Sequence, residues 1–175
     1  MTDLSHALFA ARKAAEDAAI MIREKFGDAS GARIKSQSQD LVTDTDLEAE
    51  KIILEILQKE TPYTVLSEES GLLNEKSGPI WVVDPLDGTN NFTRSLPFFA
   101  VSIGLMDGNE FLVGVIHEPV NQNEYYAVKG RGAWCNGKRI ELPAYQKDFR
   151  PSLFLNHGHA QSDRNKFRQL ADKLA

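Results

Sequence analysis

Cysteine is almost absent from this sequence: Cys135 is the single cysteine in 175 residues. An internal disulfide is therefore impossible, which excludes the disulfide-stapled class of small secreted domain and favours a reducing compartment. No run approaches the roughly 18 apolar residues of a transmembrane helix, so no membrane association is expected. The first residues, Met1–Asp3, lack the basic start and apolar core of a signal peptide. These absences predict a cytoplasmic location.

Positive charge is also scarce, since 20 Lys and Arg stand against 25 Asp and Glu, for a net charge of -5. A general nucleic-acid-binding protein would show a basic excess, so no nucleic-acid partner is expected. Apolar residues make up 42% and charged residues 26% of the chain, which is the composition of a folded globular protein. The length is sufficient for a core that buries roughly 70% of the unfolded surface.

Two helices are predicted in the first third of the chain. Apolar residues from Leu4 to Ile22 recur every three or four positions, which draws a stripe along a helix that would end near Gly27. A second helix is predicted from Thr43 to Lys59, with Thr43 or Asp44 as its N-cap.

Short segments rich in β-forming residues follow, at 63–66, 81–84, 100–106, 111–117, 124–128 and 139–142. Asp107-Gly108 and Asn136-Gly137 are hairpin signals, and hairpins imply a largely antiparallel sheet. Helices followed by many strands predict an α+β fold rather than alternating βαβ units. A further strand at 152–156 and a helix around 167–174 are expected.

The sequence richest in chemistry follows the strand predicted at 81–84. Asp84 and Asp87 flank Pro85, which stiffens the turn, and Gly88 lets the backbone approach a ligand closely. Amides near Thr89 are expected to open a short helix, whose N-terminus would attract an anion. Asp-Gly alone is typical of a type I turn. Carboxylates for a cation and amides for an anion in one turn instead suggest a metal-bridged phosphate.

A second acidic pair, Glu68-Glu69, follows the strand predicted at 63–66. Together with Asp84 and Asp87, Glu68 could supply the few oxygen ligands that Mg²⁺ takes from protein, whereas Glu69 is expected to be a solvated loop residue.

Asp44 and Asp46 open the second helix in an EF-hand-like spacing, but Ala49 stands where an EF-hand needs glycine. Calcium binding is therefore rejected there. From this segment alone, helix capping and orientation of a water remain equally open roles for both acids.

Five segments together resemble the inositol monophosphatase family of magnesium-dependent, lithium-sensitive phosphatases. They are 41–46, 66–70, 84–92, 96–104 and 132–137. The resemblance implies a layered αβ(αβα) sandwich in which two N-terminal helices lie on a large antiparallel sheet. Residues 1–148 would form the metal-binding lobe and residues 149–175 the start of an incomplete second lobe. The family's later Trp-Asp motif is missing, because neither Trp81 nor Trp134 precedes an aspartate.

The resemblance also implies a role for each residue of the site. Mg²⁺ would be bound by Glu68, Asp84, Asp87 and the carbonyl of Leu86. Asp46 and Thr89, with Glu68, would form the catalytic group that acts on the attacking water. The implied substrate contacts come from Glu68, Leu86, Asp87, Gly88 and Thr89, and Lys35 falls near the site.

The function that the resemblance implies is Mg²⁺-dependent hydrolysis of a small phosphomonoester such as inositol monophosphate, by a metal-activated water. A related sugar-bisphosphate or nucleotide phosphatase is the first alternative. A catalytically impaired binding or regulatory fragment is the second. Family members commonly dimerise, so a homodimer is a further expectation.

Overall fold

The computed structural model describes residues 3–27, 30–34 and 41–142. Lys35, the strand predicted at 152–156 and the helix predicted at 167–174 lie outside these residues. The chain divides into two compact units, Met1–Ile140 and Glu141–Ala175. The first unit contains all the helices and strands described below, and the lobe boundary at residue 148 stays a prediction.

Both predicted N-terminal helices are confirmed. Helix α1 spans Leu4–Glu24 and is capped by the Asp3 carboxylate, which accepts hydrogen bonds from two amides of the first turn. Helix α2 spans Asp44–Glu60, and Thr43 is its N-cap. Thr43 and Asp46 form a reciprocal capping box, in which each side chain accepts a hydrogen bond from the other residue's backbone.

Eight strands form one sheet, and a further pair, β1 (Arg33–Ile34) and β2 (Leu41–Val42), stands apart from it. The strands of the large sheet are β3 (Thr64–Ser67), β4 (Gly71–Leu73), β5 (Ile80–Asp87), β6 (Ala100–Asp107), β7 (Glu110–Glu118), β8 (Asn123–Val128), β9 (Gly132–Cys135) and β10 (Lys138–Arg139). Their order across the sheet is β10-β9-β8-β7-β6-β5-β3-β4. All neighbouring pairs are antiparallel except β3 and β5, which run parallel. The prediction of an α+β fold with a largely antiparallel sheet is therefore confirmed.

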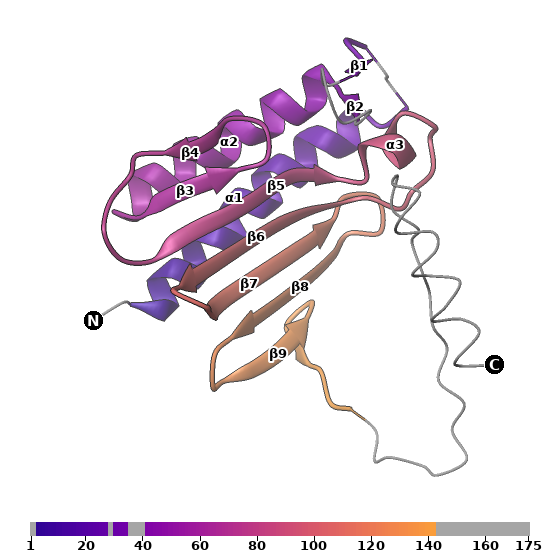
Figure 1. Ribbon diagram of the computed structural model, residues 1–175. Helices are drawn as coiled ribbons and strands as arrows, with labels where there is room; N and C mark the ends of the chain where they lie inside the picture. Colours follow the sequence, from indigo (N-terminus) through magenta and orange to yellow (C-terminus); the bar gives the residue numbers. More distant parts are fainter. Residues whose placement is uncertain (1–2, 28–29, 35–40, 143–175) are drawn as a thin grey trace, which may run out of the picture. The chain divides into compact units, whose positions relative to one another are not determined.

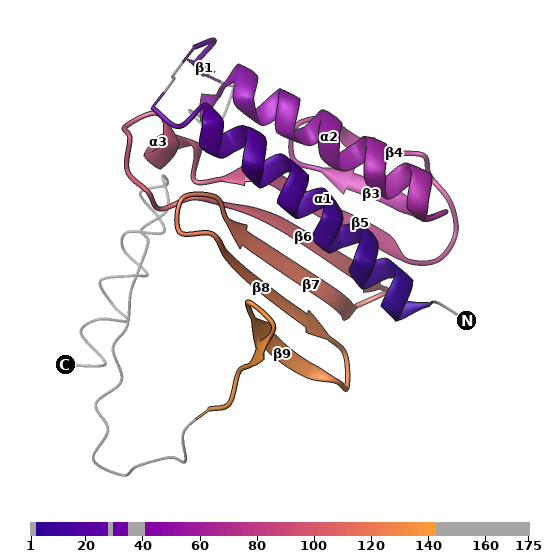
Figure 2. The same ribbon diagram turned by 180° about the vertical axis from the view of Figure 1, so that it is seen from behind.

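Helices α1 and α2 cover one face of this sheet (Figures 1 and 2). Helix α1 contacts β6, β7 and β8, and α2 contacts β5. The contact face of α1 is made almost entirely of alanine, which lets the helix lie close to the strands. The buried alanines are Ala7, Ala10, Ala11, Ala14, Ala15, Ala18 and Ala19. Facing them from the sheet are inward residues such as Trp81, Val101, Ile103 and Val115.

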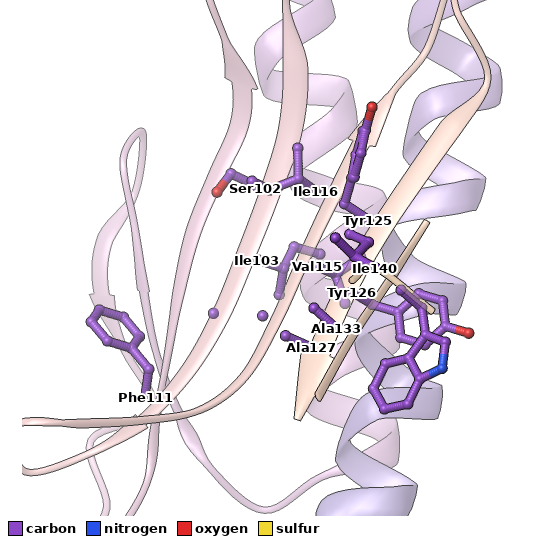
Figure 3. Close-up of a pocket in the computed structure, with 13 residues that line it drawn as sticks. Ser102, Ile103, Phe111, Val115, Ile116, Tyr125, Tyr126, Ala127, Ala133 and Ile140 are labelled. Atoms are coloured by element: carbon purple, nitrogen blue, oxygen red, sulfur yellow. The ribbon is translucent and has the colours of Figure 1, made fainter. Parts of the chain in front are cut away.

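The opposite face of the sheet carries a shallow apolar hollow of about 310 Å³ across β6, β7, β8 and β9 (Figure 3). Gly104 and Gly114 lie opposite each other in its floor, and Phe111, Ile116 and Ile140 line it. The predicted phosphate and metal residues do not line this hollow. Among the described residues, no helix is long and apolar enough to cross a membrane.

Candidate active site

The acids at the end of β5 lie on the strand itself, not in a turn after it. Strand β5 continues through Asp87, three residues beyond the predicted end, and its pairing with β6 shifts register between Asp84 and Asp87. Such an irregularity re-aims side chains at the end of a strand. The short helix expected at Thr89 is present as α3, Thr89–Phe92.

Gly88 makes the change from β5 to α3 possible. It precedes the first turn of α3 with φ of 99°, in the left-handed region that glycine adopts without steric penalty. A Cβ atom at this position would also lie 2.8 Å from the carbonyl oxygen of Phe98. Glycine was predicted here because it would let the backbone approach a ligand. The structure adds a second reason, since the backbone of Phe98 occupies the space that a side chain at position 88 would need.

Carboxylates crowd together around Asp84. The pKa of Asp84 is raised to about 7, first by burial and then by the charge of Glu68, a hydrogen bond shared with the Glu68 side chain and the charge of Asp87. The hydrogen bond from the Leu86 amide lowers this pKa. That amide donates to Asp84 Oδ1 over 3.2 Å. Three of the predicted ligands thus belong to one electrostatic cluster, in which burial and the neighbouring negative charges favour the protonated form of Asp84.

Thr89 joins this cluster to helix α2. Its hydroxyl lies 2.8 Å from Asp46 Oδ1 and 3.1 Å from the carbonyl oxygen of Leu86. The other oxygen of Asp46 accepts hydrogen bonds from the amide and the hydroxyl of Thr43. Asp46 is 1% exposed. The structure therefore shows that Asp46 caps the helix and contacts Thr89, while its role toward a water stays a prediction.

Sequence reasoning missed the contact between Glu50 and Ser70 near the site. Glu50, on the buried side of α2, accepts hydrogen bonds from the amide and the hydroxyl of Ser70, directly after the Glu68-Glu69 pair. An acid among the buried positions Ala49 and Ile53 was the available signal, because an acidic residue on an apolar helix face needs a specific partner. Glu69 is half-buried and Glu68 is exposed, the reverse of the order expected for this pair.

Within the described residues, no group of three or more His, Cys, Asp or Glu side chains is arranged as a metal site. The predicted ligand set is not made of side chains alone, since it includes the carbonyl of Leu86. Its chemistry fits a hard divalent cation, because every donor is an oxygen. Glu68 and Asp87 place further negative charge beside the partly buried Asp84, and such a cation would offset that charge. These residues therefore fit Mg²⁺ in donor type and charge.

The sequence of this chain is similar to those of known proteins. The model of the inositol monophosphatase family matches residues 3–174. An inositol monophosphatase 1 from Rattus norvegicus is 38% identical over 157 residues, which cover 87% of this chain and 55% of the relative. A fructose-1,6-bisphosphatase/inositol-1-monophosphatase from Aquifex aeolicus is 37% identical over 144 residues, covering 81% and 54%.

The fold is similar to solved structures as well. The extragenic suppressor protein suhB from Bartonella henselae superimposes with a TM-score of 0.74 at 34% identity, covering 79% of this chain and 55% of that one. The sequence matches and the fold define one class of protein, in which the two relatives above are named as phosphatases. This chain belongs to the inositol monophosphatase family. It spans about half the length of the curated relatives it matches.

Proposed function

We propose that this chain carries the metal and phosphate site of a Mg²⁺-dependent phosphomonoester hydrolase. The observation that carries the proposal is the convergence of two groups of residues. Glu68, Asp84 and Asp87 form an acid cluster, and the Thr89 hydroxyl lies beside it on Asp46 Oδ1. The cluster would hold the cation together with the carbonyl of Leu86. A bound Mg²⁺ would lower the pKa of a coordinated water and offset the charge of the phosphate.

The chain's own groups would orient the water. Because the Thr89 hydroxyl donates its proton toward Asp46, its oxygen can accept a hydrogen bond from a water molecule. The Thr43 amide holds the Asp46 carboxylate in place, and Asp46 in turn holds the Thr89 oxygen in one position. Glu68 would be a further acceptor on the same water. The amides of Gly88 and Thr89 would hold the phosphate, since α3 begins there.

The substrate proposed is a small phosphomonoester such as inositol monophosphate, as the names of the relatives suggest. The name of the Aquifex aeolicus relative favours a sugar bisphosphate as the second candidate. Lithium inhibition, a homodimer and a cytoplasmic location complete the proposal.

The test is Asp87→Asn in the full chain. Asp87 is exposed, so the fold should persist while Mg²⁺ binding weakens by about tenfold or more. Titration calorimetry with Mg²⁺ and hydrolysis of a generic phosphomonoester would be measured together. The control is Asp107→Asn, which removes the same charge from an exposed position at the opposite end of the antiparallel neighbour β6. Equal Mg²⁺ binding by both variants would contradict the metal assignment.

A further inference from the structure

Helix α2 carries two buried acids one turn apart. Asp46 is 1% exposed and Glu50 is 5% exposed. Residues four apart lie on the same face of a helix, so both carboxylates point to the same side of α2. Burying a carboxylate without partners is costly, and each of these has them. Asp46 contacts Thr89 of the site. Glu50 has no part in the function proposed above.

The partner of Glu50 is Ser70, which it contacts twice. The Ser70 amide donates to Glu50 Oε1 over 3.0 Å, and the Ser70 hydroxyl donates to Glu50 Oε2 over 2.6 Å. The two oxygens of one carboxylate therefore take both polar hydrogens of one serine. A pair of hydrogen bonds of this kind fixes orientation as well as distance, since rotation of the serine would break one of them.

Ser70 is the last residue of the loop that carries Glu68. Ser67 of β3 pairs with Gly71 of β4, so the loop between them is the three residues 68–70. At its first residue, the Glu68 amide donates to the carbonyl oxygen of Val83 over 3.0 Å. Val83 directly precedes Asp84 in β5. The loop is thus held by β5 at one end and by α2 at the other.

We propose that Glu50 is a positioning residue for the metal site. By holding Ser70, it keeps the loop in the conformation that places the Glu68 carboxylate against Asp84. Helix α2 then sets the position of both halves of the site: Asp46 holds Thr89, and Glu50 one turn later holds the loop of Glu68. This inference rests on the proposed function, because it assigns Glu50 a role only where Glu68 is a ligand.

The competing role for Glu50 is to anchor the β3–β4 hairpin for stability alone. The two roles differ in what a substitution changes at temperatures where the protein is fully folded. A stability anchor would change only the unfolding transition. A positioning residue would change Mg²⁺ affinity in the folded protein, and it would loosen the loop of residues 68–70 selectively.

The test compares Glu50→Gln, Ser70→Ala and the double variant in the full chain. Glutamine keeps the size of Glu50 but is neutral and has one acceptor oxygen, so the charge-assisted bond from the Ser70 hydroxyl is replaced by a weaker neutral bond from the glutamine NH2. Mg²⁺ affinity, measured by titration calorimetry well below the unfolding transition, should fall about tenfold or more in Glu50→Gln. The double variant should lose little beyond Glu50→Gln, because both changes break the same contact. Amide exchange of the 68–71 segment should accelerate without Mg²⁺.

The matched control is Glu55→Gln, which removes the same charge from an exposed position of α2 and should leave Mg²⁺ affinity unchanged. If Glu50→Gln does not fold, Ser70→Ala decides on the same readouts. Unchanged affinity in both, with a lowered unfolding temperature, would overturn the inference and leave the metal site standing. No Mg²⁺ binding by the unaltered chain would overturn the proposed function and the inference with it.

Discussion

The hydroxyl of Thr89 joins two parts of the site that lie 43 residues apart in the sequence. The substitution Thr89→Val keeps the shape of the side chain but removes its hydroxyl. The buried carboxylate of Asp46 then loses the hydrogen bond that Oδ1 accepts from Thr89. The free energy of unfolding should fall by about 1.5–3 kcal/mol, as for other hydrogen bonds to charged groups. Turnover should fall about 100-fold or more, because a positioned proton acceptor for the water is lost. Denaturant unfolding and phosphomonoester hydrolysis measure the two effects.

Thr93→Val is the matched control for Thr89→Val. Its hydroxyl donates to the backbone carbonyl of Asn90, a neutral acceptor outside the acid cluster. The stability loss there should be smaller, about 0.5–1.5 kcal/mol, with little change in rate. A larger effect at Thr93 than at Thr89 would argue against the role of Asp46 as the fixed acceptor.

His117 links stability to pH. Burial lowers its pKa from the usual 6.5, and Arg23 adds to this, while Glu124, Glu16 and Glu118 act in the opposite direction. The unfolded chain therefore binds the proton more readily than the folded one. Stability is kept above pH 6.5 and is lost as pH falls through 6.5 toward the lowered folded value.

In His117→Gln, which does not titrate, the free energy of unfolding should fall less between pH 7.5 and pH 5.5 than in the unaltered chain. Denaturant unfolding at both pH values checks this. The buried His117 Nδ1 has no hydrogen-bond partner among the described residues, so a proton bound there would have no acceptor. Parallel stability curves for the two proteins would contradict the assignment.

At the level of elements, the junction of β5 and α3 depends on Gly88. Gly88→Ala would place a side chain at φ of 99° and a Cβ atom 2.8 Å from the carbonyl of Phe98. Gly71→Ala is the comparison, because Gly71 has φ of 70° but open space where a Cβ would be. Gly71→Ala should lose about 1–2 kcal/mol from the backbone conformation alone. Gly88→Ala should lose more stability than Gly71→Ala, because the clash with Phe98 adds to the cost of the backbone conformation. Thermal unfolding of both variants measures the difference. Equal losses would contradict the close approach.

The elements that the sequence predicted well are those with a strong local pattern. The apolar stripe from Leu4 to Ile22 gave α1, and Asn136-Gly137 gave the turn between β9 and β10, with φ of 49° and 77°. Strand β4 was missed, because its three residues are too short to show an alternation. Strand β9 was implied by the Asn136-Gly137 hairpin signal, but its bounds were not predicted. The strand predicted at 139–142 is the two-residue β10, Lys138–Arg139.

The site was predictable where its residues follow one another in sequence and not where they meet through packing. Asp84 and Asp87 could be read from one strand end. The contact between Asp46 and Thr89 was implied by the family resemblance, since no local rule joins residues so far apart. The bond between Glu50 and Ser70 had no such guide. It depends on where α2 lies against the sheet, which the packing of the helix face decides.

At the scale of the whole molecule, the two faces of the sheet differ in how they are covered. Helices α1 and α2 cover one face (Figure 2). On the other, large apolar side chains remain accessible around the hollow: Phe111 is 68% exposed, Ile116 47% and Ile140 41% (Figure 3). Contiguous exposed apolar surface favours association between copies of a protein. The 175-residue chain is therefore expected to self-associate as its concentration rises.

The double variant Phe111→Thr/Ile116→Thr tests this expectation. Threonine is also favoured in strands, so β7 should persist, and exposed substitutions of this kind change stability by only about 0.5 kcal/mol each. Light scattering across a concentration series should show a lower average mass than for the unaltered chain. Phe9→Gln is the control, because Phe9 is 56% exposed on α1, whose helix covers the other face. If Phe9→Gln lowers the mass and the double variant does not, association depends on the helical side and the sheet face has no part in it.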